Sequence, residues 1–317
     1  MATNISIGNY ISRGKLKTHP FHKSLVDYWN FSGKGNMDID RKIIKGIKGN
    51  KLTAYNFSYS LGSGYGLFKE NYFTYRKIKN VFVTDDHSVI IMNFVPANTW
   101  ILFKYGTEHL NTTRVRVTGL TANNQLAYGY SPTNDGVRVL MAIPSDGEYD
   151  LPKSVVNTQT YNIGFIVQNA LSKNVTIQQI PEHEGAIVTD GINDYLKLDK
   201  VGYKVGTIII KFKPISIKPN IVNSILNIHT DEVALQYHTS GVLNYNFTTY
   251  KNYGEYGVGI FNMDRNAATP LTLGCKLSSI SYRPKEYSNV AIYSVAIYQN
   301  VLTAEEIQKE IIKMQSL

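Results

Sequence analysis

The chain has 317 residues, a formal net charge of +9 and only 18% charged residues. That length is sufficient for two domains, each with its own hydrophobic core. A net positive charge of this size is compatible with nucleic-acid binding. However, neither a long basic run nor a zinc-finger spacing or aromatic RNA-binding motif accompanies it, so we expect no nucleic-acid partner. No segment has the length and apolar character of a membrane span, and the first residues lack the features of a signal peptide. We therefore expect synthesis in a cytosol without membrane insertion.

The first 24 residues are basic and contain no acidic side chain, since Asp27 is the first carboxylate of the chain. A segment of this composition cannot bury enough apolar surface to fold by itself. It is either a solvated tail or an arm that becomes ordered on a partner. We expect an arm, residues 1–24, that docks on an acidic partner protein through Arg13, Lys15 and Lys17.

The next region, 25–60, is predicted to be β-rich. An apolar segment at 25–31 has the composition of a strand, and a second one covers 51–57. Between them, Gly49 and Asn50 favour a tight turn because both residue types tolerate the backbone angles that a reversal needs.

A separate all-β unit is predicted between 61 and 184. Short β-rich segments, divided by turn residues, recur at regular spacing, which is typical of a β-sandwich. They cover residues 80–83, 89–94, 100–103, 114–117, 125–130, 137–143, 161–167 and 175–180. The glycine-rich segment 62–66 and the segment 181–185, in which His183 and Glu184 are expected to be solvated, would connect this unit to the rest of the chain.

A sharp polar turn is predicted at 190–194, between two β-rich halves. Gly191 can adopt the positive φ that such a turn requires. Asp190, Asn193 and Asp194 either cap the turn by bonding its backbone or supply the hard oxygen ligands of a calcium ion.

A tyrosine-rich segment near residue 250 is the predicted ligand-binding region. Tyr250, Asn252, Tyr253 and Tyr256 lie close together among glycines. Sugars stack an apolar face on aromatic rings and bond side-chain amides through their hydroxyls, so this combination suits a glycan. The alternative is that these tyrosines pack at a sheet edge or a subunit interface.

The chain is predicted to end in a short helix. Thr303 and Glu306 have the spacing of a capping box, in which each side chain satisfies a free backbone amide. Ile307, Ile311 and Met314 then recur on one helical face, which we expect to dock on a sheet.

Three motifs together resemble the concanavalin A-like lectin/glucanase fold in its laminin-G-like branch. They are the strands of 25–57, "G-A-I-V-T-D-G-I-N-D-Y" at 185–195 and "L-T-A-E-E-I" at 302–307. The resemblance implies an all-β protein: one jelly-roll sandwich made of 25–60 plus 185–317, with a second β-sandwich, 61–184, inserted in it, and a short C-terminal helix. A tandem arrangement of two sandwiches is the alternative.

The order of the three parts is also similar to virion structural proteins of Bacteroidales phages, including crAss-like phages. It implies a head fibre, tail or baseplate appendage that assembles in the host cytoplasm with other virion proteins. It further implies a homo-oligomer, with a trimer ahead of a dimer, and recognition of a host surface glycan or receptor by the lectin-like domain.

Two other functions remain as alternatives. The first is a stand-alone carbohydrate-binding lectin. The second, more distant, is a glycoside hydrolase, which on this fold needs paired carboxylates at alternate positions of one strand. Glu148 and Asp150 come nearest to that spacing, but we predict them in a turn. We therefore expect no enzyme and no cofactor other than the calcium considered above.

Overall fold

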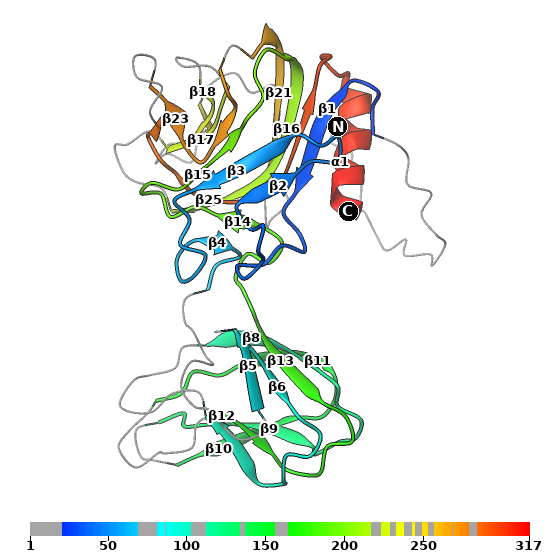
Figure 1. The fold of residues 1–317 in the computed structure, drawn as a ribbon, viewed down its shortest axis with the longest axis vertical. Helices are drawn as coiled ribbons and strands as arrows, with labels where there is room; N and C mark the ends of the chain where they lie inside the picture. The colour runs from blue at the N-terminus through cyan, green and yellow to red at the C-terminus, as the bar shows by residue number, and fades with distance from the viewer. Residues whose placement is uncertain are drawn as a thin grey trace, which may run out of the picture.

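The computed structural model describes residues 21–68, 81–85, 87–102, 112–133, 137–155, 164–216, 223–228, 233–237, 243–244, 249–252, 257–267, 269–278 and 284–317. Every described strand pair is antiparallel, and the strands form two sandwiches that lie one above the other along the longest axis (Figure 1). The predicted all-β class with one C-terminal helix is confirmed.

The upper sandwich, called here the split sandwich, is built from both ends of the chain. Its first sheet has the order β20 (Thr249–Asn252), β21 (Gly257–Asn266), β16 (Lys204–Ser216), β25 (Asn289–Tyr298), β14 (Ile187–Val188) and β4 (Gly64–Tyr65), and β1 (Leu25–Asn30) also pairs with β25. Its second sheet has the order β19 (Leu243–Asn244), β18 (Val233–Tyr237), β17 (Asn223–Asn227), β22 (Thr272–Leu273), β15 (Tyr195–Leu198), β3 (Lys51–Tyr55) and β2 (Ile43–Lys45). A small ribbon joins β23 (Lys276–Leu277) to β24 (Pro284–Lys285).

The chain leaves the split sandwich after β4 and returns to it at β14. The pairings of β1 with β25 and of β3 with β15 join segments that are far apart in sequence. The inner faces of both sheets form one core, in which Trp29, Leu52, Ile208, Leu273 and Val295 are fully buried. The expected start of the inserted unit at residue 61 is too early, because β4 pairs with β14.

The lower sandwich, called here the middle sandwich, contains the strands between β4 and β14. One sheet has the order β11 (Gly147–Leu151), β8 (Thr113–Thr118), β13 (Val175–Ile180), β6 (Ser88–Ile91) and β5 (Val81–Asp85). The other has the order β10 (Val139–Ile143), β9 (Leu126–Tyr130), β12 (Gly164–Val167) and β7 (Thr99–Leu102). A separate core between the two sheets includes Val117, Tyr128, Phe165 and Ile177.

Each of the eight predicted segments of the middle sandwich contains a strand, and sequence reasoning missed a ninth. Glu148 and Asp150 were placed in a turn, which is wrong: they lie on β11, which pairs with β8 along its whole length. β11 begins at Gly147 and is followed by Pro152, and both residue types are typical of turns, so the segment was predicted as a turn.

The helix α1 (Ala304–Ser316) packs on the outer face of the first sheet of the split sandwich. Its capping box is present, with Thr303 Oγ1 accepting the amide of Glu306 and Glu306 Oε2 accepting the amide of Thr303. Ile307, Ile311 and Met314 are buried against the sheet, as predicted. Among the described residues, no helix is long and apolar enough to cross a membrane.

A buried carboxylate on β1 joins the two sheets of the split sandwich. Asp27 accepts the amides of Tyr28, Lys48 and Asn50 at 2.8 Å each, and the side-chain amide of Asn50 at 2.9 Å. A Cβ on Gly46 would overlap this carboxylate, so only glycine fits there. The turn that leads from β2 to β3 is therefore fixed to β1, a strand of the opposite sheet.

We expect Asp27→Ala to destabilise the split sandwich by about 3–5 kcal/mol, because it leaves several buried N–H groups without an acceptor. Urea unfolding measures this loss, followed by the fluorescence of Trp29 in a Trp100→Phe background, because Trp100 lies in the middle sandwich. Asp40→Asn is the control, since Asp40 forms an exposed ion pair with Lys34. An Asp27→Ala midpoint equal to that of the control would contradict the role given to Asp27.

Candidate functional site

The predicted turn at 190–194 connects β14 to β15 and is closed by its own side chains. Asp190 Oδ1 accepts the amides of Ile192, Asn193 and Asp194 at 2.7, 3.2 and 3.3 Å. Gly191 has the positive φ predicted for it, 73°. The carboxylate of Asp190 thus replaces the backbone partners that a tight turn lacks.

The side chain of Asp194 is turned into the protein. It is fully buried, and its Oδ2 accepts the amide of Asp190 at 3.0 Å, while its Oδ1 has no hydrogen-bond partner among the residues that the structure describes. Burial, which disfavours the charged form, raises the pKa of Asp194 from 3.8 to about 6.

Two of the predicted calcium ligands, Asp190 and Asp194, bond backbone amides of the turn. Asp190 Oδ1 is used by three amides, and the backbone carbonyl of Asn193 accepts the side-chain amide of Asn56 at 2.9 Å. In the described part of the chain, no three His, Cys, Asp or Glu side chains form a group that could hold a metal. These contacts favour the capping role for Asp190 and Asp194, whereas Asn193 takes part through its backbone.

We expect Asp194→Asn to stabilise the protein at pH 7 by about 1–3 kcal/mol. The folded pKa lies above the unfolded one, so the stability that protonated Asp194 contributes is complete below about pH 4 and is lost as the pH rises through about 6. The amide cannot ionise, so the variant should lose this decline. Urea unfolding from pH 4 to pH 8 tests it. Asp199→Asn, an exposed position, should keep the wild-type profile, and the same profile in Asp194→Asn would refute the explanation.

The predicted glycan-binding residues are described only in part. Tyr250 and Asn252 lie on β20, an edge strand of the first sheet, opposite Gly259 and Gly257 of β21. Tyr253 and Tyr256 lie outside the described residues, as do Arg13, Lys15 and Lys17 of the arm.

The two connections between the sandwiches run side by side. The backbone amide of Gly66 donates to the carbonyl of Ala186 at 2.8 Å, and that of Glu182 donates to the carbonyl of Leu67 at 3.0 Å. Gly66 has a φ of 71°, and a Cβ there would overlap the ring of Pro181. The paired connections therefore depend on a glycine at position 66.

His183 is not solvated, which corrects the expectation for this connection. It is buried at 8% exposure, and its Nδ1 lies 3.2 Å from the hydroxyl of Tyr293 on β25. A lone histidine in a polar segment gave no sequence signal for this contact, because its partner is 110 residues away.

The segment that leads from β4 to the middle sandwich is held against that sandwich by two stacked aromatic rings. The rings of Phe68 and His87 are 3.6 Å apart and nearly parallel. His87 Nδ1 lies 3.1 Å from Oε1 of Gln179 on β13. These contacts are made where β5 turns into β6.

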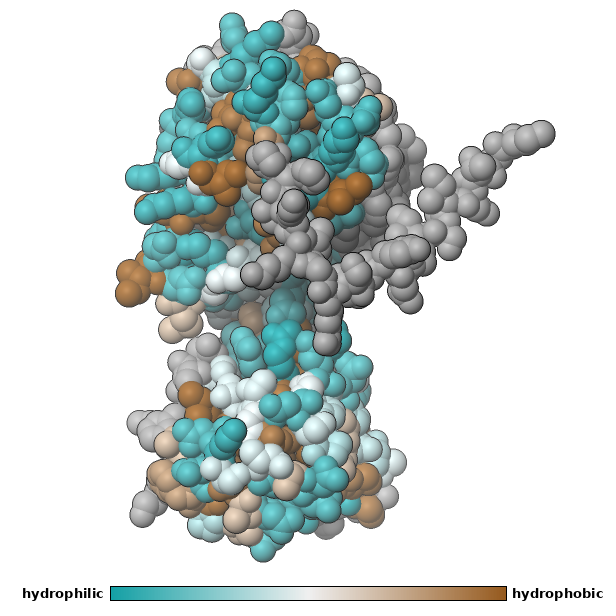
Figure 2. Space-filling view, turned by 90° about the vertical axis from the view of Figure 1, so that its right-hand side faces the viewer, coloured by the Kyte–Doolittle hydropathy of each residue, from teal (hydrophilic) through white to brown (hydrophobic). Residues whose placement is uncertain are grey.

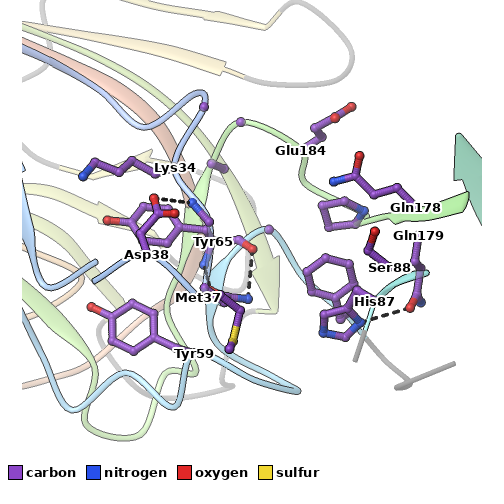
Figure 3. A pocket seen from close by; sticks show the side chains of 18 of the residues that line it. Lys34, Met37, Asp38, Tyr59, Tyr65, His87, Ser88, Gln178, Gln179 and Glu184 are labelled. Atoms are coloured by element: carbon purple, nitrogen blue, oxygen red, sulfur yellow. Dashed lines mark hydrogen bonds between the residues drawn. The ribbon is translucent and has the colours of Figure 1, made fainter. Parts of the chain in front are cut away.

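A cleft of about 650 Å³ opens between the two sandwiches beside these connections. Figure 3 shows its two walls, with Met37 and Tyr65 of the split sandwich facing Ser88, Gln178 and the His87 stack of the middle sandwich. Figure 2 shows the two sandwiches as separate bodies joined by a narrower waist. Sequence reasoning did not find this cleft, because its walls come from five separate parts of the chain.

The buried side-chain amide of Asn36 stabilises the wall of the cleft that belongs to the split sandwich. Asn36 accepts the backbone amide of Tyr65 at 2.6 Å and donates to the carbonyl of Tyr65 at 3.3 Å. The guanidinium of Arg41 donates to the carbonyl of Asn36 at 3.0 Å and lies over the ring of Tyr59. The loop 33–38 is thereby fixed to β4.

The opposite wall is held by an ion-pair network. Arg116 on β8 binds Glu148 of β11 at 2.7 Å and Glu184 of the second connection at 3.0 Å. These bonds to Arg116 hold the pKa of Glu148 below its usual value. The network fixes the second connection to the middle sandwich, although each exposed pair contributes little by itself.

No family model, curated protein or solved structure matches the chain.

We expect Gly66→Ala to destabilise the protein by about 2–3 kcal/mol or more, since it combines an unfavourable φ with an overlap on Pro181. Gly62→Ala is the matched control: its φ is also positive, at 90°, but nothing lies within 4 Å of the added Cβ. It should cost about 1 kcal/mol. Thermal unfolding of both variants measures the difference, and equal losses would show that the contact with Pro181 is unimportant.

Proposed function

We propose that the protein is a structural component of a bacteriophage virion, a head fibre, tail or baseplate appendage, that carries a surface for recognising a host glycan or receptor. The observation that supports this proposal is the position of Phe21 and His22, the described end of the arm, relative to the middle sandwich. These two residues lie against α1, whereas the middle sandwich extends from a different end of the split sandwich.

The described end of the arm, Phe21 and His22, is bound to α1. His22 donates its amide to Glu310 at 3.1 Å, and its ring lies 3.3 Å from Glu306. The ring of Phe21 packs on Tyr28 and lies 4.2 Å from the ammonium of Lys313. Figure 1 shows α1 against the split sandwich, with the middle sandwich below and clear of it. A particle bound through the arm would thus leave the cleft and the middle sandwich accessible.

The use of the carboxylates supports recognition over hydrolysis. Glu148 and Asp150, the pair nearest to the spacing of a glycosidase, lie on the edge strand β11 and form ion pairs with Arg114. The carboxylate of Glu310 is buried and accepts the hydroxyl of Tyr298 at 2.7 Å. Each of these groups has a partner within the fold.

We also propose a homo-oligomer, with a trimer ahead of a dimer. The chain has 23 tyrosines and 18% charged residues, a composition that suits contacts between copies. Particle appendages commonly close with cyclic symmetry.

We expect deletion of residues 2–20 to leave the fold intact and to abolish incorporation into the particle. The deletion retains Phe21 and His22 and so preserves their contacts with α1. Replacement of Arg13, Lys15 and Lys17 by Gln should weaken incorporation in a salt-dependent way. Quantitative mass spectrometry of purified particles, after complementation with each variant, measures occupancy.

The matched control replaces Lys45, Lys48 and Lys51 by Gln, which removes the same charge from exposed positions of the split sandwich. Its occupancy should equal that of the wild type. Wild-type occupancy of the 2–20 deletion would disprove the docking arm. A soluble monomer that is absent from all particles would favour the stand-alone lectin.

A further inference from the structure

We propose that the cleft between the two sandwiches binds a short segment of a neutral, hydroxyl-rich saccharide that contacts both walls. This inference deepens the recognition part of the proposed function and rests on it, whereas incorporation into a particle does not depend on it.

The size and position of the cleft suit such a ligand. Its volume of about 650 Å³ lies within the range of about 300–1,000 Å³ that is usual for small-molecule sites. The walls belong to two bodies with separate cores, and sites of this kind occur preferentially between domains.

Uncharged hydrogen-bonding groups line both walls. The amide of Gln178 is exposed and makes no hydrogen bond to any residue that the structure describes. The hydroxyls of Ser32, Ser60 and Ser88 also line the cleft. Amides and hydroxyls both donate and accept, which is what the hydroxyl groups of a sugar require.

The charged side chains of the cleft already have partners within the protein. Lys34 binds Asp40 at 2.9 Å, Glu184 binds Arg116 at 3.0 Å, and Asp38 accepts the amide of Gly35 at 2.9 Å. A phosphate would have to compete with Asp40 for Lys34, the charged cation of the cleft lining. A neutral ligand leaves all of them in place.

Apolar groups complete both walls. Met37 is 67% exposed on one side, and the stacked Phe68 and His87 lie on the other with Pro181. Figure 3 shows Met37 and His87 on facing sides of the cleft. The C–H face of a sugar ring packs on such surfaces while its hydroxyls reach the polar groups.

This site is distinct from the tyrosine-rich region around residue 250. In the first sheet of the split sandwich, β20 and β4 lie at opposite edges, and the cleft adjoins β4. Substitutions can therefore test the two regions separately.

The test uses the purified full chain and isothermal titration with four neutral probes: maltohexaose, cellohexaose, mannohexaose and xylohexaose. We expect at least one to bind with a Kd of about 1 mM or tighter. Gln178→Trp, which fills the cleft from β13, and Met37→Ala, which removes its apolar wall, should each weaken binding at least about tenfold, or about 1.4 kcal/mol.

Two variants serve as matched controls. Thr176→Trp alters the same strand two residues away, outside the cleft, and Ile39→Ala removes an exposed side chain of the same loop that does not line the cleft. Both should bind within about twofold of the wild type. Thermal unfolding checks that each variant is folded, and Gln178→Ala replaces Gln178→Trp if the larger side chain unfolds the middle sandwich.

Three results would overturn the inference. They are the absence of binding by all four probes at 10 mM, undiminished binding in both cleft variants, and displacement of the bound oligosaccharide by sodium phosphate. None of them affects the occupancy of the 2–20 deletion in particles, so failure of this inference and failure of the virion role are distinguishable.

Discussion

The split sandwich depends on the complete hydrogen bonding of one buried carboxylate. A charge removed from water is strongly destabilising unless it is fully satisfied, and Asp27 meets that condition with four N–H donors. Three of these donors come from the turn that leads to β3 in the second sheet, whereas Asp27 itself lies on β1 in the first. The indole of Trp29 reinforces the junction by donating to the carbonyl of Asn50 at 3.1 Å. The relative position of the two sheets is thus set by polar contacts inside an apolar core.

Asp194 is a second buried carboxylate, and it accepts fewer hydrogen bonds than Asp27. It is as deeply buried as Asp27, but one of its oxygens lacks a donor among the described residues, and burial raises its pKa to about 6. The two positions differ in the number of backbone amides directed at the carboxylate. The 46–50 turn presents two amides to Asp27, whereas three amides of the 190–194 turn bond Asp190 and only that of Asp190 reaches Asp194. Local backbone geometry thus decides how many amides each buried carboxylate accepts.

Local patterns in the sequence predicted the elements well. The capping box at Thr303 and the apolar face of α1 are short-range features, and the structure contains both. Eight of the nine described strands of the middle sandwich followed from alternation and turn residues, whereas β11 was missed because it begins with a glycine and precedes a proline. The pairing of β1 with β25 is what an insertion requires, yet periodicity alone cannot specify partners more than 260 residues apart. The cleft was beyond prediction for the same reason, since Met37 and Gln178 meet only through the placement of two separate cores. The burial of His183 likewise depends on a tyrosine that the sequence does not connect with it.

The chain leaves the split sandwich near Gly66 and returns to it near Ala186, and a backbone hydrogen bond joins these two residues. Replacing everything between them by a short turn would leave the described strand pairings of the split sandwich in place. We therefore expect that a different domain could replace the middle sandwich at this junction. Its own core shares no residue with that of the split sandwich, so substitutions within it can accumulate without disturbing the scaffold. The cleft has one wall from each sandwich, so exchange of the middle sandwich at this one junction would alter one wall of the proposed saccharide site and retain the other.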